Sequence, residues 1–135
     1  MTADVRLKVV TPSGPVIDET VRSITACSEV GEFCVLPEHR PILASLKAGR
    51  LMFERDGETK VFATDAGFFE GGPDHVHVMT QHCVAKEDVI SDEVQTQLAE
   101  LQQKLNSLSE DSAERLPVEA SIAWCEAQIR IVSEP

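Results

Sequence analysis

Aromatic side chains and positive charge are what this sequence has least of. The chain of 135 residues contains no tyrosine, only 4% aromatic residues, and a formal net charge of −11 at pH 7. A nucleic-acid surface needs Lys and Arg to meet the phosphates and aromatic rings on which the bases stack. The composition therefore argues against a nucleic-acid partner, and the negative charge also disfavours binding to an anionic membrane surface.

Long apolar runs and closely paired cysteines are missing as well. No apolar run reaches the length of about 18 residues that a membrane-spanning helix needs, so we expect no direct membrane insertion. The first ten residues resemble the start of a strand and not a signal or transit peptide. None of the cysteines forms a C-x-x-C pair, and we expect buried reduced thiols at Cys27, Cys34, Cys83 and Cys125.

The apolar residues that are present suffice for one core. They make up 42% of the chain, which favours a single domain with, at most, a small appendage. Up to about Lys86, strand-like runs cover residues 5–9, 21–27, 51–55, 58–63 and 75–79. Asp56-Gly57 between two of these runs is typical of a tight β-hairpin, because a type I′ turn needs positive φ at both central residues. Short strands at this spacing favour a sandwich or barrel.

From about Glu87 the apolar period changes to that of a helix. One stripe consists of Val94, Leu98, Leu101, Leu105 and Leu108. A second stripe begins after Pro117, which suits a first helical turn, and consists of Val118, Ile122, Cys125, Ile129 and Val132. A short polar loop joins them, so an antiparallel helical hairpin is expected. Residues 1–86 carry a net charge of −3 and residues 87–135 a net charge of −8, which marks the hairpin as a distinct acidic unit.

Residues 31–51 mix apolar side chains with charges and two prolines. Pro37 and Pro41 each fix their own φ and donate no backbone hydrogen bond. The charged residues between them should therefore lie on a stiffened loop and not in a regular element. Such a loop can present its charges to a partner, although a simple surface turn would look the same.

A metal site is one chemical alternative for this chain. His75 and His77 share a face of an expected strand, and His82 and Cys83 follow soon after. These side chains could ligate zinc, but structural zinc sites have tighter spacing, and a polar strand face is the simpler interpretation. We expect no metal.

The sequence also contains no clear combination of nucleophile, base and orienting residue for nucleophilic catalysis. Cys34 lies near His39 in the sequence, but a nucleophile also needs an orienting partner for its base. Neither a G-x-S-x-G motif nor a phosphate-binding glycine loop is present. We therefore expect no catalytic residues and no cofactor, and a protein that works by contacting others. A helical hairpin with more than one docking surface is a candidate switch.

Several motifs resemble one family. Residues 31–43, GEFCVLPEHRPIL, resemble the G-x-F-G-V-L-P-G-H-A-P-L-L signature of the ε subunit of rotary F-type ATP synthases. Lys47-Ala48-Gly49 is similar to the K-x-G step of that family, residues 65–70 stand at its G-G-F-x-E-V run, and residues 76–79 are similar to its V-T-V-L strand. Together with the order of strands before helices, the resemblance covers nearly the whole chain.

The resemblance implies an α+β fold, with a flattened β-sandwich of about ten strands in residues 1–86 and an antiparallel two-helix hairpin in residues 87–135. It implies a non-catalytic subunit of the central stalk that binds the γ subunit and the c ring and couples ring rotation to ATP synthesis. The helices of bacterial relatives can extend to the α/β catalytic head and block ATP hydrolysis. The complex would hold the chain at the cytoplasmic face of the bacterial cell membrane. The alternatives are a free-standing β-sandwich binding protein that shares only the fold and, third, a metal-dependent enzyme.

The resemblance also implies the contact residues for γ and the c ring, which are Glu32, Pro37, Glu38, His39, Arg40 and Pro41. Glu38 and Arg40 stand where the family has small residues, and we hypothesise matching changes on the c ring. Some members bind ATP through an I/L-D-x-x-R-A motif, but residues 89–95 contain no arginine, so we expect no ATP binding. The hairpin has only three basic residues, which argues against strong electrostatic inhibition of the head: Lys104, Arg115 and Arg130.

Overall fold

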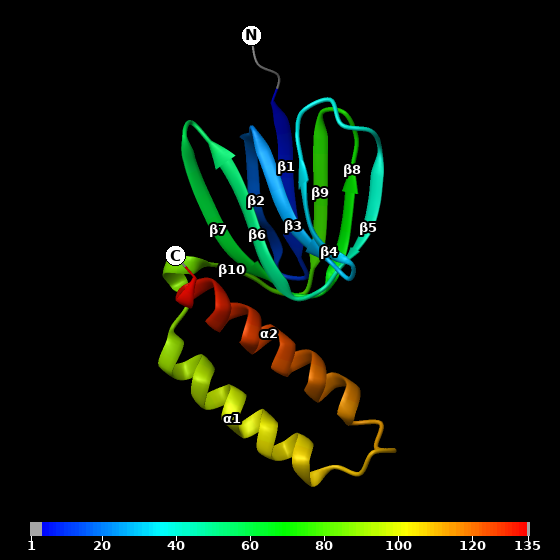
Figure 1. The fold of residues 1–135 in the computed structure, drawn as a ribbon, viewed down its shortest axis with the longest axis vertical. Coiled ribbons are helices and arrows are strands. Elements are labelled where there is room, and N and C mark those ends of the chain that lie inside the picture. The colour runs from blue at the N-terminus through cyan, green and yellow to red at the C-terminus, as the bar shows by residue number, and fades with distance from the viewer. Residues whose placement is uncertain (1–3, 135) are drawn as a thin grey trace.

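The computed structural model describes residues 4–134, and these fold into a β-sandwich with a helical hairpin beside one of its ends (Figure 1). The strands are β1 Val5–Thr11, β2 Gly14–Val21, β3 Ser23–Ser28, β4 Gly31–Val35, β5 Ile42–Leu46, β6 Gly49–Arg55, β7 Glu58–Thr64, β8 Gly67–Gly71, β9 His75–Thr80 and β10 Cys83–Ala85. A 3-10 turn, Lys86–Asp88, leads to helices α1 Ser91–Ser107 and α2 Arg115–Ser133. The predicted fold class is confirmed. Within residues 4–134, no helix is both long and apolar enough to cross a membrane.

The ten strands belong to one continuous sheet that bends back on itself. Its order is β10-β7-β6-β3-β5-β8-β9-β1-β2, with β4 paired to β3 outside this path. All strand pairs are antiparallel except that of β1 with β9, which is parallel. This pair places the first strand of the sandwich beside its ninth strand. Because the sheet folds over on itself, its strands have an inner face toward the core and an outer face toward solvent.

The alternating side chains fill the interior as the sequence predicts. Val5, Leu7 and Val9 on β1 are all fully buried, as are Val76 and Val78 on β9. Aromatic pairs complete the core: the rings of Phe33 and Phe69 meet edge to face at 4.9 Å, and those of Phe53 and Phe62 stack at 5.8 Å. Asp56 and Gly57 have φ values of 54° and 81°, so the predicted β6–β7 hairpin turn is confirmed.

One predicted strand is wrong in its extent. The run 21–27 is divided at Arg22, because Val21 ends β2 and β3 begins at Ser23. The Arg22 amide leaves the ladder and donates to the Glu54 carbonyl oxygen at 2.8 Å. The apolar pattern continues across this corner, so alternation alone cannot mark it.

Helix α2 buries two different faces, of which the sequence analysis found one. Val118 and Cys125 belong to the predicted stripe, and α2 packs along α1. Ala127, Gln128 and Ile131 are also buried, outside that stripe, and α2 also contacts strands β6 and β7. Helix α1 has only one buried residue, Val94, so most of its surface remains exposed.

The neighbours Phe68 and Phe69 test this account of the core directly. Phe69 is fully buried whereas Phe68, on the outer face, is 56% exposed. Phe69→Ala should lower the free energy of unfolding by about 3–5 kcal/mol, because it leaves a cavity, and Phe68→Ala by about 1 kcal/mol or less. Urea denaturation of both variants measures the difference, and equal losses would contradict the assigned inner and outer faces.

Candidate partner-binding surface

The β4–β5 loop, residues 36–41, is stiffened as the two prolines predict. The Glu38 amide donates to the Pro73 carbonyl oxygen at 2.8 Å, which fastens the loop to the turn between β8 and β9. His39 Nδ1 lies 3.0 Å from the Leu36 carbonyl oxygen. Its Nε2 is buried beside Gly71, where an added Cβ would come within 2.7 Å of that atom. Gly71 is thus required by the inward-turned imidazole ring.

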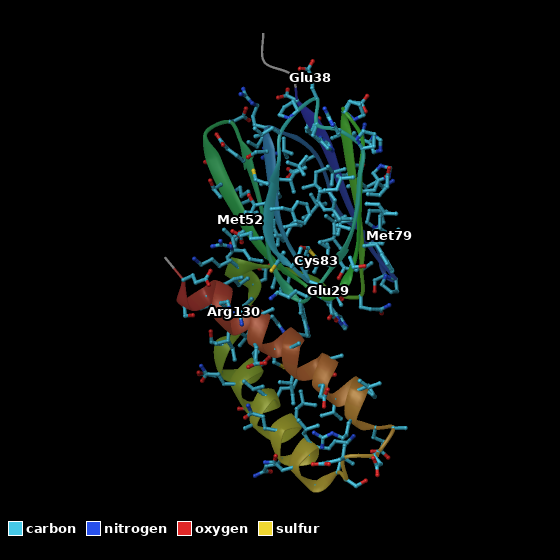
Figure 2. All side chains as sticks on the ribbon, turned by 45° about the vertical axis from the view of Figure 1, so that its right-hand side comes forward. Glu29, Glu38, Met52, Met79, Cys83 and Arg130 are labelled. Carbon is cyan, nitrogen blue, oxygen red and sulfur yellow. The ribbon has the colours of Figure 1, made fainter. Side chains whose placement is uncertain are left out.

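The predicted contact residues fall into two separate places. Residues 37–41 lie in the β4–β5 loop, and Figure 2 shows Glu38 at the end of the sandwich away from the helices. Glu32 lies on β4 itself, and it pairs with Arg50, which also binds Glu134 at the end of α2. Glu32 was predicted to lie with the loop residues, but the length of β4 places it at the opposite end of the sandwich.

Within the loop, the side chains point in different directions. Glu38 and Arg40 are exposed, whereas His39 is half-buried between them. Glu38 has a φ of 65°, in the left-handed region. For a residue with a Cβ atom, this backbone conformation costs about 1 kcal/mol more than it does for glycine.

An apolar outer face on β1, β5, β8 and β9 was not predicted as a site. Phe68 lies opposite Met79, and Met79 lies beside Val10, so the three form a row across three strands. Phe68 and Met79 are 56% and 55% exposed, and Leu43 on β5 is 78% exposed. We call Val10, Leu43, Phe68 and Met79 the apolar face.

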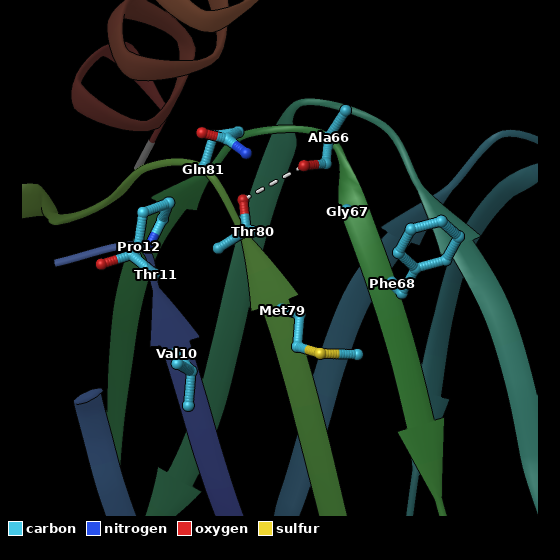
Figure 3. Close-up of a pocket in the computed structure, with 9 residues that line it drawn as sticks. All are labelled: Val10, Thr11, Pro12, Ala66, Gly67, Phe68, Met79, Thr80 and Gln81. Atoms are coloured by element: carbon cyan, nitrogen blue, oxygen red, sulfur yellow. Dashed lines mark hydrogen bonds between the residues drawn. The ribbon is translucent and has the colours of Figure 1, made fainter. Parts of the chain in front are cut away.

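A shallow groove of about 310 Å³ crosses one end of the apolar face (Figure 3). Its lining comes from the ends of β1 and β9 and the start of β8: Val10, Thr11, Pro12, Ala66, Gly67, Phe68, Met79, Thr80 and Gln81. Thr80 fixes this corner by donating from Oγ1 to the Asp65 carbonyl oxygen at 2.9 Å. The apolar face could have been predicted from the sequence, because successive side chains of a strand point to opposite faces of the sheet and Phe69 points inward, so that Phe68 must point outward. This alternation was applied only to the residues of the core.

A charged cluster lies beside the apolar face. Glu70 on β8 has Oε1 3.2 Å from His75 Nε2 and Oε2 3.7 Å from His77 Nδ1. The other ring nitrogen of His75, Nδ1, lies 3.2 Å from Asp74 Oδ1. Neutral imidazole has only one N–H, so only the protonated ring can donate to both carboxylates. The hydrogen bonds to Asp74 and then Glu70 raise the pKa of His75 above its ordinary value of 6.5.

Besides the packing of α2 on β6 and β7, polar and aromatic contacts hold the hairpin to the sandwich. At the end of α2, Arg50 Nη1 donates to Glu134 Oε2 at 3.1 Å, and Lys86 Nζ donates to the Glu134 carbonyl oxygen at 3.1 Å. Further back on the helix, Trp124 stacks on His82 with ring centroids 5.3 Å apart. His82 Nδ1 in turn lies 2.8 Å from Asp65 Oδ2. We call these contacts of Arg50, Lys86 and His82 with α2 the hairpin latch.

The basic residues of the hairpin are not all directed outward. Arg115 Nη1 donates to the carbonyl oxygens of Leu105 and Leu108, at the end of α1, and its Nε lies 3.5 Å from Glu119. Lys104 and Arg130 have no ion pair within residues 4–134.

The suggested metal ligands do not come together. His75 and His77 lie on β9, whereas His82 and Cys83 follow its far end, and His82 is engaged by Asp65 and Trp124. Among residues 4–134, no group of three or more His, Cys, Asp or Glu side chains is arranged to hold a metal ion. The four cysteines are free, and burial raises the pKa of Cys83 to about 12. Only Cys125 is buried as predicted, whereas Cys27 and Cys83 are half-buried. Cys34 is exposed, so the prediction of a buried thiol is wrong there.

Comparisons with known proteins agree on one family. The family model for the ATP synthase delta/epsilon chain β-sandwich domain matches residues 4–86. An ATP synthase epsilon chain from Bacillus subtilis is 34% identical over 108 residues, which cover 80% of this chain and 82% of that one. An epsilon chain from Geotalea daltonii is 28% identical, covering 99% and 97% of the two chains.

Two solved structures share the fold. A chain in the cryo-EM structure of the Euglena gracilis mitochondrial ATP synthase, OSCP/F1/c-ring, aligns with a TM-score of 0.82 at 23% identity. The alignment covers 99% of this chain and 84% of that chain. A chain in the Tetrahymena thermophila mitochondrial ATP synthase central stalk and c-ring aligns with a TM-score of 0.68 at 11% identity, covering 98% of each chain.

The His75 cluster gives a pH prediction. Because the pKa of His75 is raised in the folded chain, its stabilising contribution is complete below the ordinary pKa of 6.5 and is lost as pH rises through the raised value. Asp74→Asn should lower the pKa of His75 and weaken this pH dependence of stability. NMR titration of the ring protons measures the pKa, and an unchanged value in the variant would contradict the two-carboxylate arrangement.

Proposed function

The chain belongs to the epsilon family of ATP synthase subunits, and from this premise we propose that it is a non-catalytic central-stalk subunit that couples ion-driven rotation of the c ring to ATP synthesis. The observation that carries the proposal is a firmly packed sandwich with an exposed apolar face and a stiffened charged loop. In this account the catalysis takes place on other chains of the complex. The complex also holds this subunit at the cytoplasmic face of the bacterial membrane.

The two surfaces suit two kinds of partner. We assign the apolar face to the γ subunit, because exposed apolar side chains in one patch are typical of a stable protein contact. We assign the contact with the polar loops of the c ring to the region of Glu32, where the family resemblance places it. Pro37, Glu38, Arg40 and Pro41 in the β4–β5 loop are the further contact residues that the resemblance implies for γ and the ring. His39 then acts by holding the loop, since its ring is turned toward Gly71. The Euglena structure contains OSCP, F1 and the c-ring of its own complex, and the Tetrahymena structure contains the central stalk and the c-ring of its own complex.

We propose that residues 87–135 form a regulatory unit that the hairpin latch holds against residues 1–86. The salt bridges of Arg50 are partly exposed, and such pairs contribute about 1 kcal/mol or less each. Release of the hairpin breaks the pair of Arg50 with Glu134 together with the packing of α2 on β6 and β7, and it leaves the core of the sandwich intact, because no residue of the hairpin belongs to that core. Released helices would reach the α/β head, but their net charge of −8 opposes strong electrostatic inhibition there.

Binding to the γ subunit of the same organism tests the assigned face. Joint replacement of Phe68 and Met79 by alanine should weaken binding by about tenfold or more, because central apolar contacts contribute about 1–2 kcal/mol each. Leu116→Ala is the control, since Leu116 is 76% exposed but lies on α2. Absence of γ binding by the folded wild-type chain would instead support a free-standing binding protein that shares only the fold.

The single tryptophan of the chain reports on the hairpin latch. Arg50→Ala removes the bonds to both Glu32 and Glu134, so the end of α2 should separate from the sandwich more often. Trp124 emission should shift to longer wavelength and amide exchange in residues 124–134 should accelerate by about fivefold. Arg130→Ala, which removes an exposed arginine of the same helix, should change neither, and equal effects of both variants would refute the latch.

A further inference from the structure

One guanidinium group on β6 joins β4 to the end of the hairpin. Arg50 donates from Nη2 to both carboxylate oxygens of Glu32, at 3.1 and 2.9 Å, and from Nε to Glu32 Oε2 at 3.3 Å. Its Nη1 donates to Glu134 Oε2 at 3.1 Å. Strands β4 and β6 both pair with β3, so the Arg50 side chain reaches across β3 to Glu32. A single cation is therefore shared between a carboxylate of the sandwich and a carboxylate of the hairpin.

The two carboxylates use different edges of the same charge. Glu32 accepts from Nε and Nη2, and Glu134 accepts from Nη1, so both bind at once. Each carboxylate nevertheless weakens the attraction of Arg50 for the other, because the two like charges repel. The Glu32 and Glu134 side chains are 42% and 39% exposed, so water screens this effect and keeps it moderate. A change of charge at Glu32 is therefore transmitted to Glu134 at the end of α2.

The rest of the hairpin latch does not depend on these carboxylates. Lys86 Nζ donates to the main-chain carbonyl oxygen of Glu134 at 3.1 Å, and the Glu134 side chain takes no part in this bond. Further back on α2, Trp124 stacks on His82. Changes at Arg50 thus adjust how strongly α2 docks, while the other contacts keep it in place.

Glu32 marks the region in which the proposed function places the contact with the c ring. A carboxylate only accepts hydrogen bonds, so a ring loop that engages Glu32 must bring an N–H or O–H donor. A donor at Glu32 offsets part of its negative charge and leaves more of the attraction of Arg50 for Glu134. The sign is the same if Glu32 turns from Arg50 toward the ring, because Arg50 then has Glu134 as its remaining carboxylate partner.

From these contacts we infer that Arg50 couples the ring contact to the hairpin: engagement of Glu32 by the c ring tightens the docking of α2 on the sandwich, and a docked α2 strengthens the ring contact. The inference rests on the proposed function, in which the ring lies against the region of Glu32. It adds a route by which the ring acts on the position of the helices. The effect runs in both directions, because two coupled binding events change each other's affinity by the same factor.

The first test uses the isolated full chain and removes one negative charge at a time. Glu32→Gln should slow amide exchange in residues 128–132 by about twofold, because it leaves the charge of Arg50 to Glu134. Glu134→Gln should accelerate this exchange by about threefold. In the double variant, Glu32→Gln should have no further effect, since its partner across Arg50 is missing. An effect of Glu32→Gln that persists without the Glu134 carboxylate would overturn the inference.

Glu29→Gln and Glu126→Gln are the matched controls. Glu29 lies between β3 and β4, close in sequence to Glu32 and near the helices (Figure 2), and Glu126 lies on α2. Both are exposed, and neither makes an ion pair within residues 4–134. Both variants should leave exchange in residues 128–132 unchanged. Equal slowing by Glu29→Gln and Glu32→Gln would indicate a general effect of charge and contradict the role of Arg50.

The second test adds the purified c ring of the same organism in detergent. The ring should slow exchange in residues 128–132 of the wild type, and Glu134→Gln should bind the ring about twofold more weakly, while Glu126→Gln binds it like the wild type. If Glu134→Gln binds as well as the wild type, or if the ring accelerates exchange, the inference is wrong while the proposed ring contact stands. If the folded wild type does not bind the ring, the proposed contact fails and the inference falls with it.

Discussion

The parallel pairing of β1 with β9 is the constraint on which the rest of the structure depends. It joins the N-terminal β1–β2 hairpin to the β8–β9 pair and so closes the sandwich around one core. The same register sets Val9 beside Val78 on the inside and Val10 beside Met79 on the outside. A slip of one residue would exchange the two faces, burying methionine and histidine and exposing valine. The pairing register of β1 with β9 therefore determines both which side chains form the core and which form the apolar face.

The chain combines a firmly packed sandwich with a hairpin that is held against it mainly through α2. The sandwich buries large side chains completely, whereas the hairpin latch relies on partly exposed charged pairs and one aromatic stack. Full burial of one large apolar side chain is worth more than a single exposed ion pair. The expected order of opening is therefore the hairpin first and the sandwich last, which suits a subunit with one constant and one changeable part.

The sequence predicted what depends on local period and turn chemistry. Alternation identified the buried valines of β1 and β9, and Asp56-Gly57 identified the tight hairpin. The position of Glu32 was not predictable in this way, because its separation from the β4–β5 loop depends on how far β4 extends. The apolar face escaped because no single strand contains it, and Phe68 meets Met79 only through strand pairing. The inward turn of His39 likewise depends on Gly71, far along the chain.

The central claim, that the outer face of β8 and β9 is the surface that docks on the γ subunit, can be tested through two methionines. Met79 is exposed on the apolar face, and Met52 is half-buried on the opposite side of the sandwich (Figure 2). Methionine oxidation by peroxide, followed by mass spectrometry, measures the reactivity of each in the free chain and in the complex with γ. The account predicts that γ protects Met79 and leaves Met52 unchanged. Protection of Met52 with full reactivity of Met79 would contradict it.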